Sequence, residues 1–96
     1  MAAGGGVNAI DTLNRAASLM ADRARDYDHP GGERSMARAV AAFNAVTGRD
    51  LSEADGWLLM VQLKLVRLQT AKGPARVDSC EDAVAYAALM AEAVGP

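Results

Sequence analysis

Apolar side chains recur every three or four residues along most of the chain, a spacing typical of one face of an α-helix. The first such stretch contains Ile10, Leu13 and Met20, and predicts a helix over about residues 9–26. Asn8 precedes it, and asparagine is a preferred residue at the amino-terminal cap of a helix. We therefore expect regular structure to begin near Asn8.

A second stretch with the same spacing contains Met36, Val40 and Phe43. It predicts a helix over about residues 32–47, which Gly48 ends because glycine readily adopts the left-handed conformation found after many helices. The segment before it contains a proline and two glycines, and these residues favour a loop.

The third predicted helix follows Ser52, a good capping residue with acidic residues directly after it. From Trp57 to Leu68 the sequence is apolar on nearly every side, which is typical of a helix surrounded by protein. We therefore expect this helix to be central and the most buried of the set, and to end before Gly73 and Pro74.

The fourth helix is predicted over about residues 79–93. Asp78 or Ser79 serves as its cap, and Glu81 or Asp82 completes the pairing with the cap three residues later. The chain is thus predicted to be all-α, a compact bundle of about four helices with the third at its centre.

The remaining organisation is simple. Residues 1–8 are rich in alanine and glycine and are expected to be a disordered leader, and 9–95 are expected to form a single helical domain. The 96 residues leave no room for a second domain, and only 4% are aromatic, which disfavours a sheet.

The length and net charge of the chain restrict the kinds of partner that we expect. A chain this short buries only roughly 60–65% of the surface that its unfolded form exposes and is marginally stable alone, so we expect a homo-oligomer. The formal net charge of −2 makes nucleic acid an unlikely main partner, because phosphate neutralisation needs a basic face. Cys80, the one cysteine, has no internal disulfide partner and is expected to be a buried, unreactive thiol.

The chain also lacks the signs of a membrane or secreted protein. Its apolar runs, such as Trp57 to Val61, are far shorter than the ~20 residues that span a bilayer. The opening residues lack a basic and then apolar leader, so we expect a cytoplasmic location.

Two cations on the third helix are the main candidates for chemistry. Lys64 and Arg67 lie three residues apart and share a face, and buried cations need partners. Asp78, Glu81 and Asp82 of the next helix are in reach if the two helices are antiparallel. One interpretation is a structural ion-pair cluster, and the other is a site for a phosphate or carboxylate ligand.

A second candidate set lies in the loop from Arg25 to Pro30 with Glu33 after it. Its Asp, His and Glu side chains have the chemistry to hold a divalent ion, and His29 could transfer a proton. The signal is weak, because a histidine in such a turn is more often solvated or hydrogen-bonded to the backbone. Tyr27 and Tyr86 are candidates for stacking on a base, with a local hydrogen bond as the alternative for Tyr86. Glycine-rich phosphate loops, zinc spacings and catalytic triads are missing from the sequence.

Four segments together resemble a known family. They are Arg25-Asp26-Tyr27-Asp28, Phe43-Asn44, Met60 to Leu68, and Asp78 to Ala87. Their order is similar to an uncharacterised family of small phage and prophage helical proteins, over about residues 20–92, although Asp28 stands where that family usually has glycine. The last helix also resembles the acidic helix of all-α nucleoside triphosphate pyrophosphohydrolases of the MazG type, which hold magnesium on two acidic motifs.

The resemblance implies a phage or prophage accessory protein, and the missing catalytic set suggests binding without catalysis or a cofactor. Such a protein would sequester a nucleotide signal or a host defence factor in the host cytoplasm. Its expected ligand contacts are Lys64, Arg67, Arg25, Tyr27 and Tyr86.

Two alternatives stay open. One is a divergent MazG-like hydrolase that needs Mg²⁺, with Asp78, Glu81 and Asp82 as metal ligands and Asp26, Asp28 or Glu33 completing the set. The other is a helical protein-interaction module that uses an exposed apolar helix face.

Overall fold

The computed structural model describes residues 8–26 and 35–96, without the side chains of 23–26. This part of the chain is all-α, as predicted, and contains four helices and no strand. The predicted disorder of the leader before Asn8 and the predicted loop over 27–34 lie outside the described residues.

Helix α1 spans Ala9–Asp26, which confirms the predicted bounds. The side-chain Oδ1 of Asn8 accepts a hydrogen bond from the backbone N–H of Asp11 at 2.8 Å, so Asn8 caps the helix as expected.

Helix α2 spans Met36–Thr47, and its end at Gly48 was predicted correctly. Gly48 has a φ of 74° and donates its backbone N–H to the carbonyl of Asn44, which closes the last turn. The helix begins later than the predicted residue 32, with Ser35 before its first turn.

Helix α3 spans Glu53–Thr70 and starts at the predicted cap. The hydroxyl of Ser52 accepts from the N–H of Asp55 at 3.1 Å, and the carboxylate of Asp55 accepts from the N–H of Ser52 at 2.8 Å. This reciprocal pair is a capping box, which fixes where the helix begins.

Helix α4 spans Pro74–Val94, and here the prediction was wrong. The helix starts five residues before 79, with Gly73 at its cap and Pro74 in its first turn. Proline has its φ already set for a helix and lacks only an N–H that the first turn leaves unpaired, so Pro74 begins α4 instead of separating two helices. Asp78 and Ser79 therefore lie inside the helix and do not cap it.

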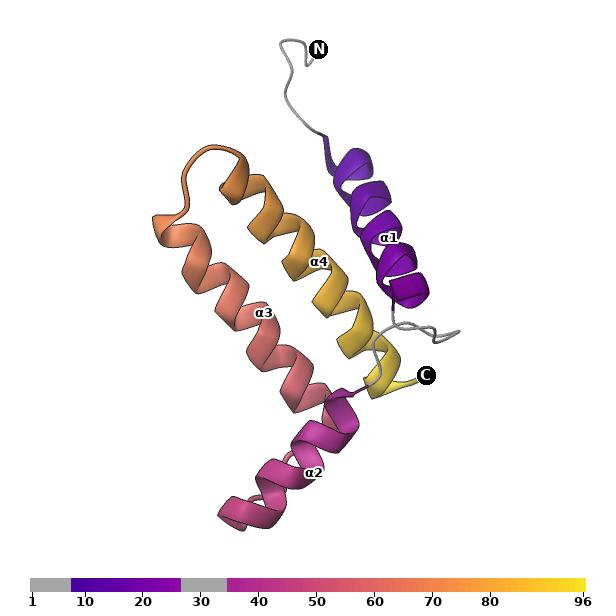
Figure 1. Cartoon of the computed structure of the whole chain (residues 1–96), viewed down its shortest axis with the longest axis vertical. Coiled ribbons are helices and arrows are strands. Elements are labelled where there is room, and N and C mark those ends of the chain that lie inside the picture. Colours follow the sequence, from indigo (N-terminus) through magenta and orange to yellow (C-terminus); the bar gives the residue numbers. More distant parts are fainter. Residues whose placement is uncertain (1–7, 27–34) are drawn as a thin grey trace.

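The four helices form a chain of contacts (Figure 1). Helices α3 and α4 run antiparallel and pack along their length, and α1 lies on α4. Within the described residues, α2 packs only on α3, near the start of that helix. The prediction that α3 is central is confirmed in this sense, because α3 joins α2 to the rest of the bundle.

The core is small and lies mainly between α4 and its neighbours. The buried hydrophobic side chains among the described residues are Ala16, Val40, Trp57, Ala85 and Leu89. The prediction that α3 is the most buried helix was wrong, since Leu58, Leu59, Leu65 and Val66 are all exposed. The described helices include none long and apolar enough to cross a membrane.

Candidate functional site

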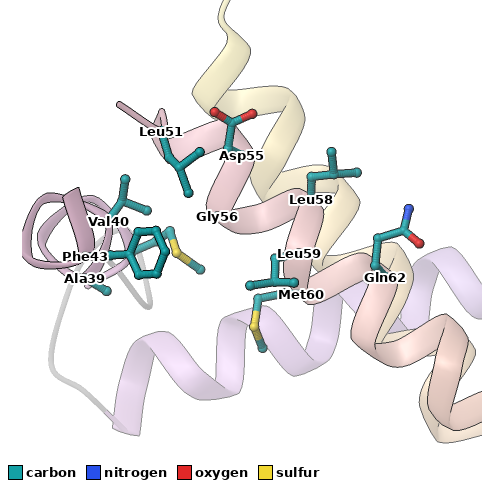
Figure 2. Close-up of a pocket in the computed structure, with 11 residues that line it drawn as sticks. Ala39, Val40, Phe43, Leu51, Asp55, Gly56, Leu58, Leu59, Met60 and Gln62 are labelled. Carbon is teal, nitrogen blue, oxygen red and sulfur yellow. The ribbon is translucent and has the colours of Figure 1, made fainter. Parts of the chain in front are cut away.

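An apolar groove lies between α2 and the first half of α3 (Figure 2). Its volume is about 590 Å³. The side chains that form most of its surface are apolar, namely Met36, Val40, Phe43, Leu51, Leu59 and Met60. Of the lining residues, Phe43, Leu51, Leu58 and Leu59 are exposed, so the groove is open to solvent.

Gly56 determines how closely the two helices approach beneath this groove. It is buried, and a Cβ atom added there would collide with the Met36 side chain and lie 2.8 Å from Cγ2 of Val40. Only glycine therefore permits the present crossing of α2 over α3. This close approach seats α2 against the first turns of α3 and forms the groove floor.

The side chain of Asn44 holds the end of the connection between α2 and α3. The Asn44 amide donates to the backbone carbonyl of Leu51 and accepts from its backbone N–H, each at 2.9 Å. These two bonds replace the backbone pairing that an irregular segment lacks. Leu51 is thereby fixed at the edge of the groove, as Figure 2 shows.

Few polar groups face the groove. Asp55 and Gln62 are its polar lining residues, and the carboxylate of Asp55 is already used in the capping box. The groove therefore suits an apolar ligand better than a charged one.

A smaller cavity of about 160 Å³ adjoins the groove residues Met36, Ala39 and Met60. Its other side is formed by Trp57 and Tyr86, whose rings stack with centroids 5.7 Å apart and planes at 24°. Trp57 is buried, as predicted, and donates its ring N–H to the carboxylate of Glu53 at 3.1 Å. Tyr86, a predicted ligand contact, thus packs its ring on a core residue.

Lys64 forms the ion pair that one interpretation predicted. Its Nζ lies 2.9 Å from Oδ2 of Asp82, and the two side chains are 14% and 19% exposed. The pair is thus mostly shielded from water and joins α3 to α4.

Arg67 does not share this arrangement. It is exposed and makes no side-chain ion pair with another described residue. Lys64 and Arg67 therefore do not form one cluster with the acids of α4.

The acids of α4 point to different neighbours. Glu81 is buried, with its side chain 7% exposed, and lies 3.5 Å from Nε of Arg15 on α1, whose side chain is 63% exposed. Asp82 pairs with α3, and Asp78 is exposed. Among the described residues, no three His, Cys, Asp or Glu side chains are grouped closely enough to hold a metal ion.

The other predicted residues are only partly described. Arg25 and Asp26 lie in the last turn of α1, and their side chains lie outside the described part of the chain. Tyr27, Asp28 and the rest of the predicted loop site, His29 and Glu33 included, lie outside it as well. Cys80 is exposed, so the prediction of a buried thiol was wrong.

Sequence reasoning did not predict the groove. The available signal was the sequence of α3, whose apolar residues occupy more faces than one neighbouring helix can cover. Such a helix is either enclosed by the fold or presents an apolar face for another molecule. The sequence predicted the first for α3, whereas its exposed leucines show that the fold does not enclose this helix.

The fold and the groove together define a small all-α protein with an open apolar groove on its surface. The chain belongs to the family described as a domain of unknown function (DUF6378), whose model matches residues 11–94. The predicted membership of an uncharacterised family is thereby confirmed. Neither a curated protein nor a solved structure matches the chain.

Proposed function

We propose that this protein acts by binding, and that the groove between α2 and α3 receives an apolar helical segment of a protein partner. The observation that carries the proposal is the row of exposed apolar side chains around an open groove of about 590 Å³. Recognition of this kind, in which the apolar face of a helix lies in a groove, uses a few anchor residues one turn apart.

The chemistry of the lining supports a helix more than a small polar ligand. A phosphate or carboxylate needs donors or cations that converge on it, and the described residues that line the groove include no Lys, Arg or His. Met36 and Met60 are flexible and polarisable, and methionine is common on surfaces that adapt to apolar partners.

The test is nuclear magnetic resonance with a designed amphipathic helical peptide that carries leucines at positions i, i+4 and i+7. We expect its addition to shift the signals of Met36, Phe43 and Leu59 and to leave those of α1 unchanged. Leu59→Lys should abolish the shifts, because a charged group would then lie in the groove. A matched control is Leu13→Lys, an exposed leucine on α1.

Shifts that are absent, or that spread over α1 and α4 as strongly as over the groove, would contradict the proposal. Circular dichroism of both variants checks that the helices remain intact.

A second candidate is a phosphate-bearing ligand at Arg67. The exposed guanidinium makes no ion pair with a described residue, and such a group suits an anion. Lys64 lies one turn away but is held by Asp82. Isothermal titration with a panel of cyclic and linear nucleotides should give heat that is lost in Arg67→Gln, and a panel without heat excludes this candidate.

The biological setting that we propose comes from the resemblance of the sequence to phage and prophage proteins. In this setting the protein works in the host cytoplasm against a host defence factor. We expect expression of the chain in a host with an active defence to raise the plating efficiency of a sensitive phage. An unchanged efficiency would count against the setting and leave the groove proposal to its own test.

A further inference from the structure

The apolar lining of the groove continues along α3 as a ridge. Leu59, Leu63 and Val66 follow one another at i, i+4 and i+7, the spacing that places side chains on one face of a helix. All of them are exposed, Leu59 at 68% and Val66 at 64%. The chain therefore carries on one helix both part of a groove and an apolar ridge with helix-anchor spacing.

We infer that the segment received by the groove is the α3 ridge of a second copy of this chain. This inference rests on the proposed function and names its partner. The groove lies beside the first half of α3, where α2 packs, and the ridge extends into the second half. In a symmetric dimer each ridge enters the groove of the other copy, and this arrangement requires the two α3 helices to run antiparallel.

The exposed surface is sufficient for a dimer of modest stability. The exposed fractions of Phe43, Leu51, Leu58, Leu59, Leu63 and Val66 add up to about three complete side chains. Burial of each removes roughly 60–120 Å² of apolar surface from water, or on the order of 300 Å² per copy. Since interfaces are about 60% apolar, the pair buries on the order of 1,000 Å², the lower end of specific interfaces.

The charges around the surface also fit a second copy. Among the described residues, Asp55 lies at the groove and Arg67 lies beside the ridge, so this surface includes charges of both signs. A patch of a single sign would repel its own copy, and this one does not. The small core of each copy gives a further reason for association, because the described residues bury only five hydrophobic side chains.

The test is sedimentation of the full chain over a wide range of concentration. We expect monomers at low concentration and dimers at high concentration, with a dissociation constant in the micromolar range. Val66→Lys should shift this constant by at least ~100-fold, because it places a charge in a buried contact of each copy. Val94→Lys is the matched control, a valine at the end of α4 that is 70% exposed and should leave the constant unchanged.

A wild-type chain that stays monomeric at the highest soluble concentration would overturn the inference, as would a dimer that Val66→Lys does not weaken or that both variants weaken equally. Failure here is distinguishable from failure of the proposed function. A monomer that still binds the leucine peptide in the groove keeps the proposed function and removes only the second copy as partner. A monomer that binds no peptide removes both.

Discussion

The two sides of α3 differ in what covers their apolar residues. On the side toward α4, Trp57 stacks on Tyr86 and Lys64 pairs with Asp82, so both ring and charge are shielded by the neighbouring helix. On the opposite side, Leu59 is exposed beside an open groove. One helix thus contributes one apolar face to the fold and leaves another exposed, in keeping with a sequence that is apolar almost all round.

The largest expected effect is on the α4 side, from Trp57→Ala. Replacement of a buried tryptophan by alanine costs about 3–5 kcal/mol, a large part of the ~5–15 kcal/mol that stabilises a small domain. The variant should lose the stack on Tyr86 and unfold at a much lower urea concentration. Chemical denaturation followed by circular dichroism measures the loss.

Trp57→Phe is the control for this prediction, since it keeps an aromatic ring on Tyr86 and removes the N–H that Glu53 accepts. It should cost roughly 1–2 kcal/mol, for the lost hydrogen bond and the smaller ring. Equal effects of the two variants would show that the stack contributes little.

The second largest effect is expected at the contact between α2 and α3. Gly56→Val should force α2 away from α3, because Met36 and Val40 already occupy the space of a side chain at this position. We expect a loss of about 2–3 kcal/mol, of which overpacking is the main part. Hydrogen exchange should show faster exchange of the amides of α2 and little change in α4.

Gln69→Val controls for the helix propensity of valine at an exposed position of the same helix. If it costs as much as Gly56→Val, the close approach of α2 is not the cause.

Local sequence signals predicted most helix ends, and the starts of α2 and α4 were the exceptions. Asn8, Ser52 and Gly48 act through bonds within a few residues, so each could be assigned from its own neighbourhood. The role of Pro74 was predicted wrongly because proline both ends helices and begins them. The structure shows that α4 starts there, after Gly73 with a φ of 59°.

The candidate site could be predicted only in part, because it depends on how the helices pack against one another. The pairing of Lys64 with an acid of α4 follows from an antiparallel hairpin and was one of the two interpretations. Glu81 was assigned to the same cluster, but it pairs with Arg15, which lies far away in the sequence. The groove depends on the position of α2 across Gly56, and periodicity carries no information on how two helices cross.

The third prediction tests the shielded ion pair. Lys64→Met removes the ammonium group that lies 2.9 Å from the partly buried carboxylate of Asp82, and should cost about 1–2 kcal/mol. The double variant Lys64→Met with Asp82→Leu removes both charges and should recover most of the loss. A double-mutant cycle by urea denaturation gives the coupling, and a coupling near zero would place this pair among ordinary surface charges.

The smallest effect on stability is expected on the open side of α3, from Leu59→Lys. Its side chain is already mostly in water, so in dilute solution the free energy of unfolding should change by less than ~0.5 kcal/mol. Urea denaturation at low and at high protein concentration measures this change in the free energy of unfolding, which can then be compared with that of Trp57→Ala. At high concentration the wild type gains stability by mass action if its copies associate, and the variant does not. A large loss already in dilute solution would mean that this side of α3 is covered in the free protein, and the difference between the two faces would disappear.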